Sequence, residues 1–247
     1  MKTSELNEII NKTAPYELAA EWDNCGLLLD CGLEINSALF ALDATNEALA
    51  EAERLGCGAL VTHHPAIFGA VKALSAPDPV VTAAMKHISL FAAHTCWDSA
   101  SGGVNDVLCE RLGVEDKEFW PPFGRIGSLK SENPAALAEK VKKALGLKRI
   151  SYVDCQNRIE RVAVVGGAAG DLIAAAKWCG CDAFITGELK HHEALLAKQI
   201  GISAIAAGHF ATEAISMRAF CESVQRESGG ALKCLLFEDE RDPLTCA

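Results

Sequence analysis

Histidines and carboxylates recur in this sequence at spacings that suit metal binding. The adjacent pair His63-His64 directly follows the apolar run 59–61, and Pro65 ends the segment. Two later segments, His94-x-x-x-Asp98 and His209-x-x-x-Glu213, each place an imidazole and a carboxylate four residues apart. That spacing puts both groups on one face of a helix. Imidazole and carboxylate together suit Zn, Fe, Mn, Co or Ni. The candidate ligands are His63, His64, His94, Asp98, His209 and Glu213.

The adjacent histidines predict two metal ions rather than one. Successive side chains of an extended segment point to opposite sides, so His63 and His64 suit two metals, with one imidazole each. A bridging carboxylate would hold two such ions about 3.5–4 Å apart. The set lacks thiolates, which argues against a structural zinc site rich in cysteine. Cys96 is interpreted as a buried filler, with a soft metal ligand as the alternative.

The elements that position these residues follow from the pattern of apolar runs. Short runs alternate with helical patterns, which is typical of βα units around a largely parallel sheet. Asp78-Pro79 and Asn133-Pro134 mark helix starts, and Gly146 marks a helix end. Open α/β sheets bind ligands at the carboxyl ends of their strands, where the candidate ligands stand. We expect strands at residues 38–42, 59–62, 90–93, 161–165, 183–186 and 203–207.

The chain also repeats itself. Residues 56–62 match 180–186 at an offset of 124, residues 39–44 match 163–168 at the same offset, and residues 92–98 match 207–213 at an offset of 115. We therefore expect an α/β fold of two similar halves, with mixed or parallel sheets and a metal crevice between the halves at the strand ends. Prolines near residues 121–134 place the domains at 1–125 and 126–247. A likeness of βα units through composition alone is the alternative.

Composition limits the class of protein and of partner. Among 247 residues, 23 Lys and Arg stand against 33 Asp and Glu, which gives a net charge of −10, and 50% are hydrophobic. This is a globular composition, and without a basic cluster general nucleic-acid binding is not expected. The polar N-terminus and the absence of an apolar run of ~20 residues predict neither a signal peptide nor a membrane span. We expect a cytoplasmic protein in which most of the eleven cysteines are reduced and buried.

Four ordered motifs carry a resemblance to a known family. They are residues 21–27 (EWDNCGL), 61–68 (VTHHPAIF), 94–106 (HTCWDSASGGVND) and 208–213 (GHFATE). Together they resemble the motifs of the GTP cyclohydrolase I type 2 family, also called the NIF-three-like family, from residue 5 to about residue 237. The resemblance implies a cytoplasmic, ring-shaped homohexamer whose metal sites face a central cavity. The length resembles the short form, which lacks an inserted domain.

The resemblance also implies a dinuclear site with two divalent metal ions per chain. The family's ligand positions fall on His63, His64, Asp98, His209 and Glu213. Glu213 takes the position that bridges both ions, and His94 matches a pocket histidine beside them.

Further residues are expected near this pocket. The resemblance puts Trp22 and Asp23 there; we interpret Trp22 as a core anchor, with stacking on a purine as the alternative. The pair His191-His192 stands at an expected helix start and is interpreted as lying either behind the metal ligands or at the cavity wall. Lys190 or Arg125 is a candidate cation for a triphosphate.

These residues support more than one function. The first hypothesis is metal-assisted hydrolysis, with His94 as the catalytic residue that shuttles protons. The resemblance implies GTP as the small-molecule substrate, with hydrolytic opening of the guanine ring and release of formate. The alternative is a non-enzymatic protein that handles or inserts metal or has a regulatory role, because a set of metal ligands does not by itself show that a reaction is catalysed. A metal-dependent nucleotide or phosphoester hydrolase is the third hypothesis.

Overall fold

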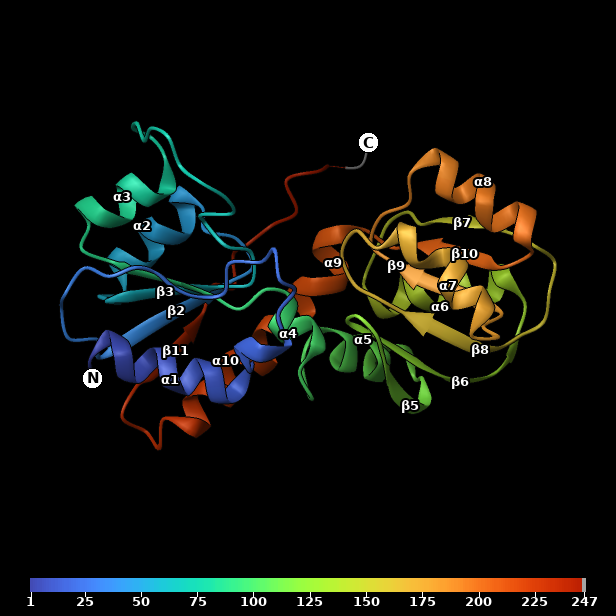
Figure 1. The fold of residues 1–247 in the computed structure, drawn as a ribbon, viewed down its shortest axis with the longest axis horizontal. Helices are drawn as coiled ribbons and strands as arrows, with labels where there is room; N and C mark the ends of the chain where they lie inside the picture. Colours follow the sequence, from blue (N-terminus) through green and yellow to red (C-terminus); the bar gives the residue numbers. More distant parts are fainter. Residues whose placement is uncertain (246–247) are drawn as a thin grey trace. The chain divides into compact units, whose positions relative to one another are not determined.

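The computed structural model describes residues 1–245 and divides them into two compact α/β units (Figure 1). The first unit comprises Met1–Gly103 and Ser216–Arg241. The second comprises Val104–Ile215 and the described end of the chain. Each unit is built on one mixed sheet with helices on its faces. The predicted α/β class, with a mixed sheet in each of two units, is therefore confirmed.

The division differs from the predicted boundary at residue 125. Residues 104–125 belong to the second unit because β5 (Glu115–Trp120) pairs with β6 (Gly124–Glu132). Residues 216–241 return to the first unit because β11 (Lys233–Leu236) pairs with β2 (Ser37–Ala41). The pairing of β11 with β2 joins residues nearly 200 positions apart, such as Lys233 and Ser37, and leaves no local signal for the return of residues 216–241.

The first sheet has the strand order β1-β4-β3-β2-β11. Strands β2, β3 (Ala59–Thr62) and β4 (Ser89–Ala92) run parallel, β11 is parallel to β2, and β1 (Gly26–Leu29) is antiparallel to β4. The three central strands are buried throughout, as expected for parallel strands covered on both faces.

The second sheet has the order β5-β6-β8-β9-β10-β7. Its parallel core consists of β8 (Ile159–Val164), β9 (Ala183–Thr186) and β10 (Ser203–Ala206). The added strands, among them β7 (Ser151–Val153), pair antiparallel. All six predicted strands lie in the two parallel cores. Among the strands that were not predicted, β7 has only three residues and β5 is mostly exposed and charged.

Helices cover both faces of each sheet. In the first unit α2 (Asn46–Arg54) and α3 (Pro79–Met85) pack on one face, opposite α1 (Thr3–Thr13) and α10 (Met217–Glu227) (Figure 1). The N-caps agree with the sequence prediction, since the Asp78 carboxylate accepts a hydrogen bond from Val80 N at 2.8 Å. The 3₁₀ turns are Tyr16–Leu18, Gly170–Leu172 and Ala214–Ser216.

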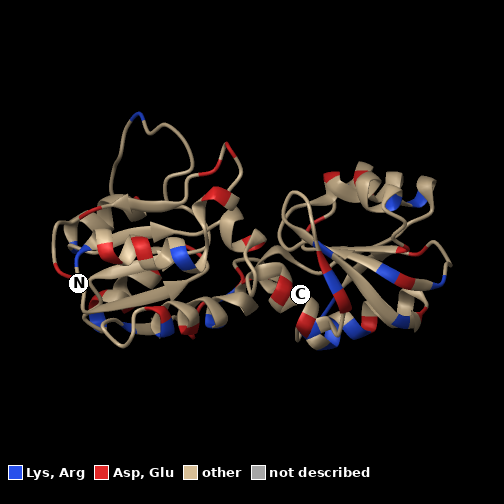
Figure 2. Ribbon diagram, turned by 60° about the horizontal axis from the view of Figure 1, so that its bottom comes forward, with Lys and Arg blue, Asp and Glu red and all other residues tan. Residues whose placement is uncertain are grey.

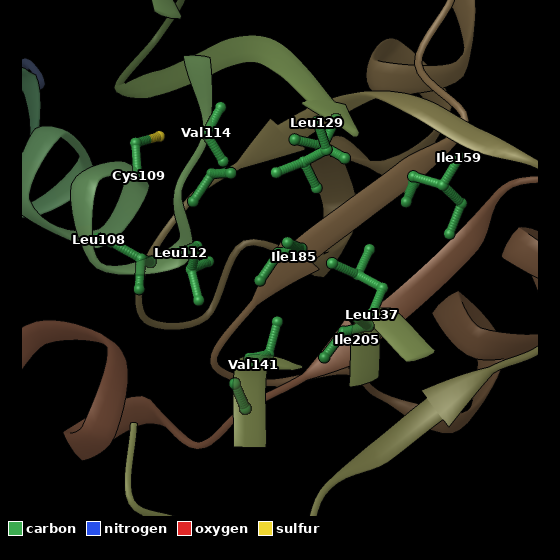
Figure 3. Close-up of a cluster of buried hydrophobic side chains, with 14 of the residues drawn as sticks. Leu108, Cys109, Leu112, Val114, Leu129, Leu137, Val141, Ile159, Ile185 and Ile205 are labelled. Carbon is green, nitrogen blue, oxygen red and sulfur yellow. The ribbon is translucent and has the colours of Figure 1, made fainter. Parts of the chain in front are cut away.

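The second unit follows the same plan. Helices α5 (Val104–Leu112) and α6 (Pro134–Ala144) enclose one apolar cluster against the sheet, in which Leu108, Val141 and Ile185 are fully buried (Figure 3). Helices α7 (Ile173–Trp178) and α8 (His191–Ile200) cover the opposite face. Two five-residue helices complete the units: α4 (Thr95–Ser99) follows β4, and α9 (His209–Glu213) follows β10. In both units the segment that carries candidate ligands thus comes directly after a central strand.

Charged residues of both signs lie on the helices of both units. Lys and Arg are interspersed with Asp and Glu over the helices of each unit (Figure 2). Among the described residues, every helix is too short or too polar to cross a lipid bilayer.

Trp97 anchors the short helix α4 within the first unit. Its side chain is 1% exposed, stacks on Phe220 of α10 at a centroid distance of 4.6 Å, and donates a hydrogen bond from Nε1 to Ser216 Oγ at 3.1 Å. A helix of five residues has little stability of its own, so this anchor holds α4 in place.

Trp97→Ala should lower the free energy of unfolding by about 3–5 kcal/mol, because it leaves a large cavity in a packed core. Thermal unfolding followed by circular dichroism measures the change. The matched control is Trp178→Ala, since Trp178 is 88% exposed and its loss should change stability by less than about 0.5 kcal/mol. Equal effects of the two substitutions would contradict the anchoring role.

Candidate metal centre

His63 and His64 lie at the carboxyl end of β3, where the backbone remains paired. His63 N donates to Ala41 O at 3.3 Å, and His64 N donates to Leu42 O at 3.0 Å. The Thr62 hydroxyl donates to His64 O at 2.7 Å. Both histidines are therefore held by the sheet rather than by a loose loop.

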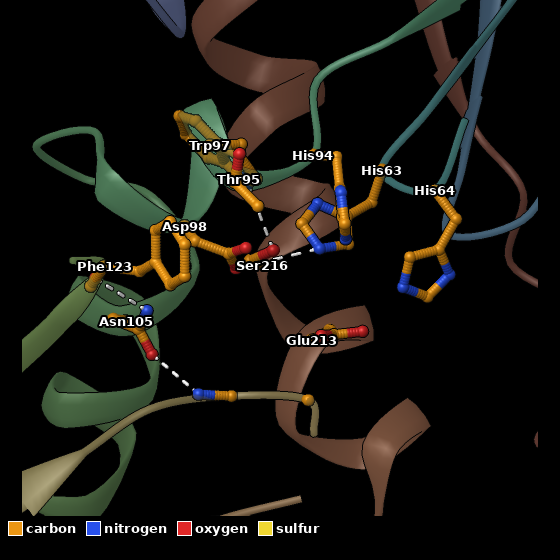
Figure 4. Close-up of polar contacts among 12 residues, drawn as sticks. His63, His64, His94, Thr95, Trp97, Asp98, Asn105, Phe123, Glu213 and Ser216 are labelled. Atoms are coloured by element: carbon orange, nitrogen blue, oxygen red, sulfur yellow. Dashed lines mark hydrogen bonds and ion pairs between the residues drawn. The ribbon is translucent and has the colours of Figure 1, made fainter. Parts of the chain in front are cut away.

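The imidazoles of His63, His64 and His94 converge (Figure 4). One ligand atom from each lies within 4.8 Å of the other two. The ring centroids of His63 and His64 are 4.9 Å apart, and that of His94 lies 5.1 Å from His63. The prediction that adjacent histidines point to opposite sides is wrong here, because the chain turns at the end of the strand. Three imidazoles are thus available to ions in one small volume.

A hydrogen bond from Nδ1 fixes the tautomer of His63. This nitrogen lies 3.0 Å from the carbonyl oxygen of Ala93. A carbonyl only accepts hydrogen bonds, so Nδ1 carries the proton and Nε2 presents its lone pair. The imidazole is also fully buried. His63 is therefore oriented to ligate through Nε2.

Carboxylates hold the other two imidazoles in the same way. His64 Nδ1 lies 2.8 Å from Asp43 Oδ1, and His94 Nδ1 lies 3.0 Å from Asp23 Oδ1. A carboxylate on the far nitrogen of a metal-binding histidine orients the ring and raises its basicity. Metal ligands in proteins are typically supported in this manner. The arrangement therefore fits metal binding by Nε2 of His64 and fixes the orientation of the His94 ring beside it.

Asp23 is itself tightly held. Its Oδ2 accepts hydrogen bonds from the backbone N of Thr95 at 2.9 Å and from the Thr95 hydroxyl. Burial alone would raise the pKa of the Asp23 carboxyl, but the hydrogen bonds from His94 and Thr95 outweigh it and hold that pKa below its ordinary value. Asp23 therefore stays ionised beside His94.

Asp43 is positioned by the C-terminal segment of the first unit. The Glu240 carboxylate accepts hydrogen bonds from the backbone N of Leu42 at 2.7 Å and of Asp43 at 2.9 Å. These bonds fix the turn after β2 from which the Asp43 side chain reaches His64.

Helix α4 supplies a carboxylate to the same group. Asp98 is 8% exposed, and its Oδ1 lies 3.7 Å from Nε2 of His63 (Figure 4). Cys96, two residues earlier, is fully buried, and its thiol donates to Cys25 Sγ at 3.3 Å. Among the described residues, the groups that could hold a metal do not include Cys96. Its interpretation as a buried side chain rather than a soft ligand agrees with these contacts.

The second unit presents His209 and Glu213 on α9. His209 Nε2 lies 3.1 Å from Glu213 Oε2, so the spacing of four residues does place both groups on one helix face. His209 Nδ1 lies 2.8 Å from Glu188 Oε1, just beyond β9. The carboxylate support seen in the first unit therefore recurs here.

Gly167 makes room for the buried Glu213 side chain. A Cβ at this glycine would lie 2.2 Å from Glu213 Oε1, and the backbone has a φ of +65°. Both facts require glycine. In the internal repeat, Gly167 corresponds to Asp43. The two units thus use one position differently, as a carboxylate that supports His64 and as a gap that admits Glu213.

Sequence reasoning missed Asp43 and Glu188 as supporting carboxylates. Both directly follow the end of a predicted strand, Asp43 after β2 and Glu188 after β9. An acidic residue at the carboxyl end of a parallel strand was the signal that could have identified them.

Trp22 and Arg125 do not have the roles that the sequence predicted for them. Trp22 is 59% exposed, stacks on Phe68 at 5.8 Å and meets the His94 ring edge-on at 5.9 Å. Its interpretation as a core anchor is therefore wrong. Arg125 is 4% exposed and its Nε lies 2.6 Å from Asp106 Oδ1, so it is a buried structural cation rather than a binder of triphosphate.

The segment 190–192 lies at the start of α8. Lys190 is its N-cap, His191 is its first residue, and both histidines of the pair are exposed. Among the described residues, the groups that could hold a metal do not include His191 or His192. Lys190 is also largely exposed, with its side chain 75% accessible. It stays a candidate cation.

Known proteins resemble this chain over nearly its whole length. A "GTP cyclohydrolase 1 type 2 homolog" of Clostridium perfringens is 30% identical over 258 residues, which cover 98% of each chain. The structure titled "Reduced HcgD" from Methanocaldococcus jannaschii matches with a TM-score of 0.83 at 28% identity, over 96% of this chain and 98% of that one.

A Bacillus cereus protein described as related to NIF3 matches with a TM-score of 0.92 over 100% of this chain and 99% of that one. At 21% identity it supports the fold alone. The family model described as Duf34/NIF3 (NGG1p interacting factor 3) matches residues 1–243. The four motifs and the supported histidines thus occur in a chain that matches this model throughout, and the protein belongs to the Duf34/NIF3 family.

Proposed function

We propose that this protein binds two divalent metal ions and uses them to hydrolyse a nucleotide. The observation that carries the proposal is the convergence of three imidazoles whose Nδ1 atoms are all held by carbonyl or carboxylate oxygens. Such support is typical of metal ligands and costs metal affinity when it is removed.

The donor set fits the implied metals. Imidazole nitrogen and carboxylate oxygen suit Zn, Fe, Mn, Co or Ni, whereas a soft thiolate set would favour Cu(I) or a structural zinc site. His63, His64 and Asp98 would hold metal in the first unit. We assign His209 and Glu213 to the same dinuclear centre because the resemblance puts both on ligand positions, with Glu213 as the bridge.

A bound divalent ion would lower the pKa of a coordinated water to about 7 and polarise the bond under attack. The chain's own contribution is proton transfer by His94. Because Asp23 holds Nδ1 of this imidazole, Nε2 is the atom that exchanges the proton, and the carboxylate stabilises the imidazolium form.

GTP is the proposed substrate, with hydrolytic opening of the guanine ring and release of formate. The names of the curated relatives support this choice. The exposed Trp22 beside His94 offers a surface on which a purine can stack. A cytoplasmic homohexamer, as the resemblance implies, is part of the same proposal.

Asp43→Ala should weaken metal binding about 10- to 100-fold, because His64 loses the carboxylate that orients it. Competition with a chromogenic chelator for Zn²⁺ measures the affinity. Glu34→Ala removes an exposed carboxylate of the same unit and should leave the affinity unchanged. An Asp43→Ala variant that binds Zn²⁺ as tightly as the unchanged protein would contradict the supporting role of this carboxylate.

Glu213→Gln should abolish binding of both metals, since an amide keeps the shape of the side chain but cannot bridge two cations with a carboxylate. Inductively coupled plasma mass spectrometry measures the number of metal ions bound per chain. Glu222→Gln, at an exposed position of α10, serves as the matched control. Two ions retained in Glu213→Gln would rule out the bridging assignment.

Incubation of the metal-loaded protein with GTP should release formate, which an enzymatic assay detects. His64→Ala should lose both metal and formate release, whereas His94→Ala should keep its metal and lose formate release. Retained metal without formate from GTP would favour metal handling over hydrolysis. Metal loss in His94→Ala would instead make His94 a ligand.

A further inference from the structure

Two cysteines of the first unit form a close pair. Cys25 precedes β1 and Cys96 lies in α4, and the thiol of Cys96 donates to Cys25 Sγ at 3.3 Å. Cys96 is fully buried, whereas Cys25 is partly accessible to solvent. A disulfide needs the two sulfurs at about 2.05 Å, so an approach of roughly 1.2 Å would join them.

Cys25 is connected to the residues that hold His94. Its thiol donates to Asp23 Oδ2 at 3.3 Å, and its sulfur accepts a hydrogen bond from the backbone N of His94 at 3.4 Å. The other oxygen of the same carboxylate holds His94 Nδ1. Any chemistry at Cys25 therefore acts on the support of His94.

We propose that Cys25 and Cys96 form a reversible dithiol/disulfide modification site, oxidised by a peroxide and restored by a small thiol. Cys25 is the sulfur that the oxidant meets, because Cys96 is fully buried. Cys96 is the resolving thiol, because its own hydrogen bond points it at Cys25.

The reaction with hydrogen peroxide balances in two steps. The Cys25 sulfur attacks one peroxide oxygen and breaks the O–O bond, which gives a sulfenic acid and one water that carries the thiol proton. The Cys96 sulfur then attacks the Cys25 sulfur, forms the S–S bond and displaces hydroxide, which leaves as water with the Cys96 proton. Two thiols are oxidised and one peroxide is reduced to two waters.

Oxidation changes the surroundings of Asp23. Cys25 loses the proton that it donates to Asp23, and the movement of Cys25 toward α4 alters its contact with the backbone of His94. We expect the disulfide form to release formate from GTP about tenfold more slowly than the dithiol form, because His94, the proposed proton-transfer group, loses part of its support. This coupling rests on the proposed function, whereas formation of the disulfide does not.

The full-length protein is treated with hydrogen peroxide, alkylated under denaturing conditions and digested. Mass spectrometry should find a peptide pair that joins Cys25 to Cys96, lighter by two hydrogens and cleaved by dithiothreitol. Cys25→Ser and Cys96→Ala should each abolish this pair. Cys221→Ser should keep it, although Cys221 hydrogen-bonds another cysteine, Cys234.

Alkylation of both Cys25 and Cys96 after peroxide treatment would overturn the modification site. Formate release by the metal-loaded oxidised and reduced protein is then compared, with Cys25→Ser as the variant whose rate peroxide should leave unchanged. Equal rates in the oxidised and reduced protein would overturn the coupling. A reduced protein that releases no formate would instead refute the proposed hydrolysis, and the peptide map would still decide whether the disulfide forms.

Discussion

The hydrogen bond from Nδ1 of each candidate ligand histidine is the interaction on which the site depends. An imidazole can ligate through either nitrogen, and an acceptor on Nδ1 selects Nε2 and fixes the ring. The acceptors are the carbonyl of Ala93 for His63 and the carboxylates of Asp43, Asp23 and Glu188 for His64, His94 and His209. Each acceptor lies within a short segment that follows a central strand or, for Asp23, precedes β1. In each unit the parallel core of the sheet thus supplies the candidate ligands and most of their supports at its carboxyl end.

This arrangement explains why a doubly covered parallel sheet suits the site. Strands buried on both faces leave their carboxyl ends as the exposed edge where polar side chains can gather. The short helices α4 and α9 then add carboxylates without needing long loops. Anchoring α4 through Trp97 converts a marginal helix into a fixed support for Asp98.

The two units show how one repeated framework diverges in chemistry. Position 43 carries the carboxylate that orients His64, whereas the matching position 167 is a glycine that Glu213 requires. Position 64 is a candidate ligand, and its counterpart Glu188 supports His209. The Cys25 and Cys96 pair has no counterpart of this kind, because the repeat pairs Cys96 with Ala211. The proposed redox chemistry therefore lies in the first unit, at the support of His94.

The sequence alone determined the central strands, the helix caps and the identities of the candidate ligands, because local periodicity and capping chemistry are encoded over a few residues. It also determined the i, i+4 relation of His209 and Glu213. Only the tertiary structure decided that His63 and His64 converge and that Arg125 is buried against Asp106. The same holds for the return of residues 216–241 to the first unit. These features depend on strand pairing and packing between residues far apart in the chain, which no local pattern records.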